Sequence, residues 1–201
     1  MPLRRGEGAD NIYLELTLYK NQLQLGTKDV LYSDGDRYTP AVAAVKHMDD
    51  FLPHIRTALV LGAGLCSIVQ VIRKKKADPH FTLVEKDKVV LEWAMEFLEP
   101  NGPDKIRPVC ADAVDFMQAD KAKYDFLFLD IFKGRVVPSF VYTSGFLAAC
   151  KSCLAPGGRI AFNYIVNNKE EWEQVKNTFT SVFPENRIIA SSVNRILIGS
   201  R

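Results

Sequence analysis

Hydrophobic and polar residues alternate one by one near the start of the chain. The apolar members share one side of an extended segment and their neighbours share the other: Ile12, Leu14, Leu16 and Leu18 against Tyr13, Glu15, Thr17 and Tyr19. This period of two predicts a half-buried strand, and apolar runs at 23–25 and 30–32 can pair with it. We therefore predict a small antiparallel β unit over residues 1–35. Because an isolated hairpin is marginal in water, the unit must pack on the rest of the chain or on another subunit.

From residue 36 onward the pattern alternates between strands and helices. Near-helical apolar spacing covers 40–51, where Pro40 suits a first turn. The later segments predict strands at 58–62, 81–85, 107–110, 125–130, 159–166, 187–191 and 194–199, and helices at about 65–76, 88–98, 113–119 and 144–154, with a last helix presenting Trp172, Val175, Phe179 and Val182. Short links between alternating elements predict one α/β domain over 36–201, with a parallel sheet covered on both faces and an antiparallel pair at its end.

The composition changes this picture little. The chain has 201 residues, 47% of them hydrophobic and 25% charged, with a net charge of +2. These values are typical of a water-soluble globular protein. Its net charge is too small to produce an electrostatic field that attracts nucleic acid or membranes. No apolar stretch approaches the roughly 20 residues that cross a bilayer, and the N-terminus lacks the apolar core of a signal peptide. We expect a cytoplasmic protein with no nucleic-acid or membrane partner.

Four cysteines fit a reducing compartment. Cys150 and Cys153 form one C-x-x-C inside a predicted helix, without a second pair or a histidine partner. Such a pair is a poor zinc site, so we expect free thiols and no metal.

The candidate chemistry begins where a buried strand runs into a glycine turn, Ala58-Leu-Val-Leu-Gly-Ala-Gly64. Glu85 ends the next strand about 20 residues later, where a ribose-binding acid is expected. Asp112 and Asp130 follow the third and fourth strands. Ligands of such sheets bind over the carboxyl ends of the strands, so we expect these acids and the glycines in one cleft.

This arrangement suits an adenosine moiety. Glu85 can accept from both ribose hydroxyls and Asp112 from the adenine amine, while Gly62 and Gly64 let the backbone approach the nucleoside. A pyrophosphate is less suitable, because the sixth position of the glycine fingerprint is Ser67 and the carboxylates would repel phosphates. A nicotinamide dehydrogenase is therefore a weak alternative.

Further segments follow one another in a characteristic order: Leu61-Gly-Ala-Gly-Leu-Cys66, Val84-Glu-Lys-Asp87, Ala111-Asp-Ala-Val-Asp115, Tyr124-Asp-Phe-Leu-Phe-Leu-Asp130 and Leu154-Ala-Pro-Gly-Gly158. Together they resemble the Rossmann-like class I S-adenosylmethionine-dependent methyltransferase superfamily, and more narrowly its spermidine synthase branch. The resemblance implies an adenosyl sulfonium donor and a homodimer. It places the donor on Gly62, Ala63, Gly64, Glu85, Lys86, Asp112, Ala113 and Asp130.

Three positions depart from that branch. The spermidine synthases that this chain resembles have an acid at the position of Leu65, a second acid at the position of Lys133, and a glutamine at the position of Thr39. The missing acids are those that hold the ammonium ends of the donor and of putrescine. A lysine near a diammonium substrate repels it, and Lys133 or Arg135 near the cleft would favour a donor that carries a carboxylate.

We therefore expect methyl transfer from S-adenosylmethionine to a small-molecule acceptor. Asp130 is the best candidate for the catalytic base, and Tyr38 is a candidate for facing the substrate cation. Aminopropyl transfer from decarboxylated S-adenosylmethionine is the alternative enzymatic function. A non-catalytic nucleoside-binding homologue is a third possibility, because a chain that has lost acceptor-site acids can also have lost turnover.

Overall fold

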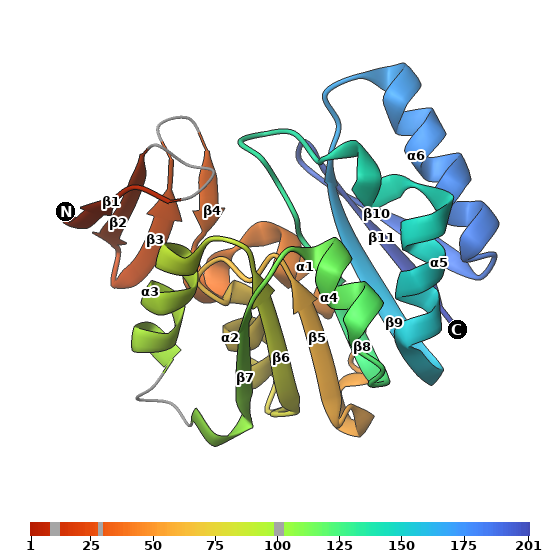
Figure 1. Ribbon diagram of the computed structural model, residues 1–201, viewed down its shortest axis with the longest axis horizontal. Coiled ribbons are helices and arrows are strands. Elements are labelled where there is room, and N and C mark those ends of the chain that lie inside the picture. Colours follow the sequence, from red (N-terminus) through yellow and green to blue (C-terminus); the bar gives the residue numbers. More distant parts are fainter. Residues whose placement is uncertain (9–12, 28–29, 99–102) are drawn as a thin grey trace.

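The computed structural model describes residues 1–8, 13–27, 30–98 and 103–201, which form two β-sheets and the helices around them (Figure 1). The first sheet has the order β1-β2-β3-β4, and all its pairs are antiparallel. Its strands are β1 (Pro2–Gly6), β2 (Leu14–Tyr19), β3 (Gln22–Gly26) and β4 (Leu31–Ser33). The alternation over 14–19 is confirmed as a strand, while Ile12 lies outside the described residues.

The second sheet has seven strands in the order β10-β11-β9-β8-β5-β6-β7. They are β5 (Thr57–Leu61), β6 (His80–Glu85), β7 (Ile106–Cys110), β8 (Tyr124–Leu129), β9 (Leu154–Ile165), β10 (Asn186–Ser191) and β11 (Asn194–Ser200). Strands β5 to β9 pair in parallel, and β10 and β11 add an antiparallel edge. The predicted α/β fold class is confirmed. The chain runs outward from β5 to β6 and β7 and then returns to β8 on the other side of β5, which makes the β5/β8 boundary the switch point.

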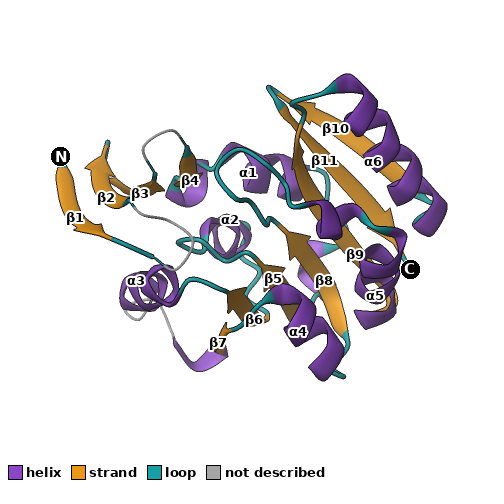
Figure 2. Cartoon of the chain, turned by 45° about the horizontal axis from the view of Figure 1, so that its top comes forward, coloured by secondary structure: helices purple, strands orange, loops and turns teal. Residues whose placement is uncertain are grey.

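Helices cover both faces of this sheet (Figure 2). They are α1 (Thr39–Lys46), α2 (Ser67–Lys74), α3 (Lys88–Leu98), α4 (Ala113–Ala119), α5 (Ser144–Cys153) and α6 (Lys169–Val182), with short 3-10 turns η1 (Gly35–Arg37), η2 (Leu52–His54), η4 (Pro103–Lys105) and η5 (Ser139–Tyr142). Because strand side chains alternate, Val60 packs in the core under α1 to α3, and its neighbours Leu59 and Leu61 pack in the core under α4 to α6.

Three predicted boundaries are wrong, each for a local reason. Helix α1 ends at Lys46 instead of 51, because the chain turns there and enters η2 around Pro53. Helix α2 begins at Ser67 instead of 65, because Cys66 has a φ of 59° and belongs to the glycine turn. Strand β9 begins at Leu154 instead of 159, and an irregularity of its pairing with β8 accommodates the Pro-Gly-Gly segment.

The small sheet packs against the larger body of the protein. Leu14 and Leu25 are fully buried in the same core as α1 to α3, and Arg4 lies over the ring of Trp93 in α3. The alternation at the start of the chain does not extend to β1, which is an exposed edge strand without an apolar face. None of the helices in the described segments is long and apolar enough to span a membrane.

Candidate functional site

A cavity of about 300 Å³ opens at the carboxyl ends of the central strands, beside the switch point. It is lined by almost every residue that the sequence proposes for the site: Tyr38, Gly62, Ala63, Gly64, Glu85, Lys86, Asp112, Ala113, Asp130 and Lys133. Arg135 does not belong to this lining. The cavity therefore gathers side chains from five separate parts of the chain.

The turn after β5 requires glycine at two positions, Gly62 and Gly64. Gly62 has a φ of +85°, and a Cβ atom there would lie 2.3 Å from the carbonyl oxygen of Asp130. Gly64 has a φ of +50°, and its Cβ would lie 2.7 Å from Oγ of Ser33. Both positions therefore need glycine, for conformation and for space. The backbone forms the floor of the cavity next to Asp130.

Glu85 ends β6 and reaches under this turn. Its Oε2 accepts from the Gly64 amide at 3.2 Å, and its Oε1 accepts from the Asp87 amide at 3.1 Å. Burial raises the pKa of Glu85, while these N–H donors act in the opposite direction. Each oxygen still has a lone pair for a hydroxyl group of a ligand. The carboxylate is thus held in one orientation in the cavity wall.

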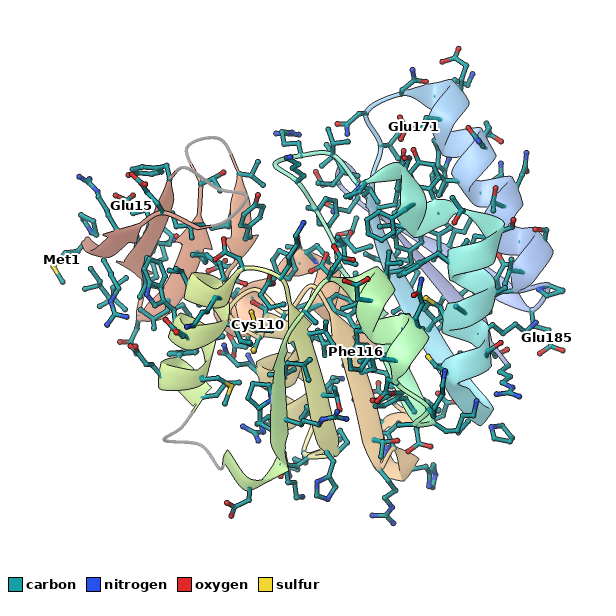
Figure 3. All side chains as sticks on the ribbon, viewed as in Figure 1. Met1, Glu15, Cys110, Phe116, Glu171 and Glu185 are labelled. Atoms are coloured by element: carbon teal, nitrogen blue, oxygen red, sulfur yellow. The ribbon has the colours of Figure 1, made fainter. Side chains whose placement is uncertain are left out.

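Asp112 and Lys86 lie at the next strand ends along the sheet. Asp112 caps α4, since its Oδ1 accepts from the Val114 amide at 2.8 Å. Its Oδ2 lies 3.7 Å from Nζ of Lys86. Cys110, labelled in Figure 3, ends β7 and donates from Sγ to the carbonyl of Lys86 at 3.8 Å. These contacts place Asp112 and Lys86 side by side at one end of the cavity.

Asp130 follows β8 and carries the strongest electrostatic perturbation among the acids of the cavity. Burial raises its pKa from 3.8 to about 7, against the effect of hydrogen bonds from Asn163 and Tyr38. Nδ2 of Asn163 donates to Oδ1 of Asp130 at 2.7 Å. Burial also raises the pKa of Tyr38 well above its usual value, so its hydroxyl remains a donor. A carboxylate that titrates near neutral pH can take up and release a proton under physiological conditions.

Asn163 is a site residue that the sequence analysis missed. It is fully buried in β9, and its Oδ1 accepts from Nδ2 of Asn194 at 2.8 Å, which fixes the orientation of the amide. The available signal was an asparagine in the middle of the apolar run Ile160-Ala-Phe-Asn-Tyr. A buried polar side chain in such a strand needs partners, and here they are Asp130 and Asn194.

The loop after β8 borders the cavity next to the glycine turn, since a Cβ atom at Gly62 would lie 3.2 Å from Cα of Ile131. Lys133 exchanges backbone hydrogen bonds with Val136, which closes the loop, and its side chain is exposed at the cavity rim. The carbonyl of Arg135 accepts from Nδ2 of Asn167 at 3.0 Å, away from the cavity lining. Leu65 is buried in the core beside α2 and does not line the cavity either.

A family model described as the spermine/spermidine synthase domain matches residues 36–197, which is more than half of the chain. The polyamine aminopropyltransferase of Vibrio vulnificus is 27% identical over 154 residues, which cover 74% of this chain and 51% of that protein. The chain thus spans about half the length of this curated relative.

Solved structures with the same fold cover most or all of the chain. A probable spermidine synthase from Corynebacterium glutamicum has a TM-score of 0.81 at 19% identity, over 100% of this chain and 81% of its own. Human methyltransferase-like protein 13, solved in complex with SAH, has a TM-score of 0.67 at 22% identity, over 82% of this chain and 80% of its own. At these identities the likeness establishes the fold.

Proposed function

We propose that this chain, which belongs to the spermine/spermidine synthase family, transfers a group from an adenosyl sulfonium donor to a small amine. The first candidate for the group is the aminopropyl group of decarboxylated S-adenosylmethionine, as the name of the Vibrio relative suggests. Family membership confirms the resemblance that the five sequence segments carry. The observation that carries the proposal is the near-neutral Asp130 carboxylate in a cavity of about 300 Å³ that the glycine turn and Glu85 also line.

The donor half of the cavity supports this proposal. The two glycines leave the backbone bare, and Glu85 offers both carboxylate oxygens to the ribose hydroxyls. Asp112 lines this half with its Oδ2 3.7 Å from Nζ of Lys86, while Ala113 adds a small apolar surface for a base. The donor supplies a carbon activated by its bond to the sulfonium, and the protein positions it.

The chemical contribution of the protein is proton removal. An amine is protonated in water and attacks a carbon only after losing that proton. Asp130, with a pKa of about 7, suits this task. It is partly ionised at neutral pH, and its ionised form is basic enough to accept a proton. Asn163 and Tyr38 hold the carboxylate in place by hydrogen bonds from two different elements.

Methyl transfer from S-adenosylmethionine is the second candidate, and a specific observation favours it. Lys133 lines the cavity, where like charges in contact repel by about 1 kcal/mol in water and more in a cleft. This cation opposes a diammonium acceptor such as putrescine. The name of the relative favours the first candidate, and the side chain at 133 favours the second.

One product assay separates these functions. The purified chain is incubated with each donor and a panel of small amines, and the nucleoside product is identified. Aminopropyl transfer releases methylthioadenosine, while methyl transfer releases S-adenosylhomocysteine. Asp130→Asn keeps the shape of the site but cannot accept the proton, so it should abolish either product. Absence of any product with every donor, despite donor binding, would refute group transfer and support a nucleoside-binding protein.

A further inference from the structure

Ser67 is a buried polar residue in the cavity wall to which the proposed function assigns no role. Its side chain is 4% exposed and lines the cavity, and its Oγ makes no hydrogen bond within the described residues. A buried hydroxyl without a partner is unusual, because it loses its hydrogen bonds to water without replacement. An unmatched donor that lines a ligand cavity points to a ligand atom that accepts from it.

The same residue opens helix α2, and the N-terminus of that helix adds further donors. The amides of Ser67 and Ile68 begin the helix, so no carbonyl one turn earlier accepts from them, and both residues line the cavity. The first turn contains no acidic residue. The aligned peptide dipoles make this end attractive to an anion.

The cation Lys133 also lines the cavity. The hydroxyl of Tyr32 accepts from the Gly134 amide at 3.0 Å, and Oγ of Ser33 accepts from the Leu65 amide at 2.8 Å. Strand β4 therefore holds the Lys133 loop and the turn that leads into α2 through two consecutive residues. Within the part of the chain that the structure describes, the Lys133 side chain has no ion pair.

Two carboxylates of the cavity lining have partners, whereas Oδ2 of the buried Asp87 makes no hydrogen bond within the described residues. Asp112 lies beside Lys86, and Glu85 accepts from the Gly64 and Asp87 amides. The donors that lack a partner are the Ser67 hydroxyl and the first amides of α2, and Lys133 adds a cation to the same cavity lining.

We propose that Ser67, the N-terminus of α2 and Lys133 form a subsite for a carboxylate carried by one of the two substrates. This inference rests on the proposed function only in placing an adenosyl donor and an amine in the cavity. The carboxylate has two sources, the amino-acid end of S-adenosylmethionine or an amine acceptor that is itself an amino acid. In both cases the substrate class is carboxylated.

Two matched ligand pairs test the subsite by calorimetry. S-adenosylmethionine is compared with its decarboxylated form, and, in the presence of methylthioadenosine, ornithine is compared with putrescine. In each pair the two ligands differ by one carboxylate. We expect about tenfold tighter binding of the carboxylated member in one pair, since a charge-assisted hydrogen bond has about that effect. The pair that discriminates identifies the source.

Variants show whether the named residues carry this preference. Lys133→Ala and Ser67→Ala should each reduce it at least several-fold, while Lys88→Ala removes an exposed lysine outside the cavity and should leave it unchanged. Ser67→Ala removes an unpartnered hydroxyl, so the melting temperature without ligand should not fall.

The outcomes separate this inference from the proposed function. If methylthioadenosine binds but neither pair discriminates, or if the preference survives both variants, the carboxylate subsite is refuted and group transfer stands. If the preference and its loss are observed but no donor and amine give a product, the subsite stands and group transfer fails. If no adenosyl ligand binds, both are refuted.

Discussion

Replacing Asp130 with asparagine should stabilise the protein while abolishing its activity. Asparagine keeps the shape of the side chain, so its oxygen can still accept from Asn163 and its amide group can donate to the Tyr38 hydroxyl. The variant differs in having no charge to bury. Because burial raises the pKa of Asp130, the ionised carboxylate is less stable in the folded protein than in the unfolded chain.

The magnitude follows from the two pKa values. The carboxyl group has a pKa of 3.8 ordinarily and about 7 in the folded protein. One pKa unit corresponds to about 1.4 kcal/mol, so the ionised form costs up to about 4 kcal/mol. Between these pH values the folded state binds more protons than the unfolded state. Stability therefore decreases as pH rises from about 4 to about 7, and the full cost is present above that range.

Urea unfolding of both proteins at pH 4 and pH 8 measures this difference. The asparagine variant should be more stable than the parent at pH 8 by a few kcal/mol, and the advantage should vanish toward pH 4. Asp104→Asn, at an exposed carboxylate, should change the free energy of unfolding by less than about 0.5 kcal/mol at either pH. Equal stabilities at pH 8, or an advantage of the same size at pH 4, would refute the assignment of a buried, charged Asp130.

The remaining predictions concern the donor site and the base. Glu85→Ala should remove the thermal stabilisation by methylthioadenosine, and an unchanged shift would contradict its role at the ribose. Gly62→Ala should cost more than about 2 kcal/mol in urea unfolding, because the φ of +85° and the Asp130 carbonyl both oppose a Cβ atom. The kcat/KM should rise with pH through about 7 as Asp130 ionises. Tyr38→Phe removes a donor that lowers this pKa, so the midpoint should move upward, and a downward move would contradict it.

Much of the site could be predicted from the chain because it is encoded in local segments. A strand that runs into Gly-Ala-Gly64, and acids at the ends of the following strands, place their own side chains at one edge of a parallel sheet. Asn163 was missed because its partners are distant in sequence, 33 residues away at Asp130 and 31 residues away at Asn194. No period or motif connects such positions.

Periodicity and turn residues by themselves determined the order of the strands and helices, since both follow from backbone geometry and burial. They also determined the family resemblance, which depends on the spacing of short motifs. Tertiary structure alone decided which polar groups remain without a hydrogen-bond or ion-pair partner. Packing buried Leu65, left Arg135 outside the cavity, and placed Lys133 and Ser67 on its wall. It also raised the pKa of Asp130, because desolvation depends on every element that surrounds the carboxylate.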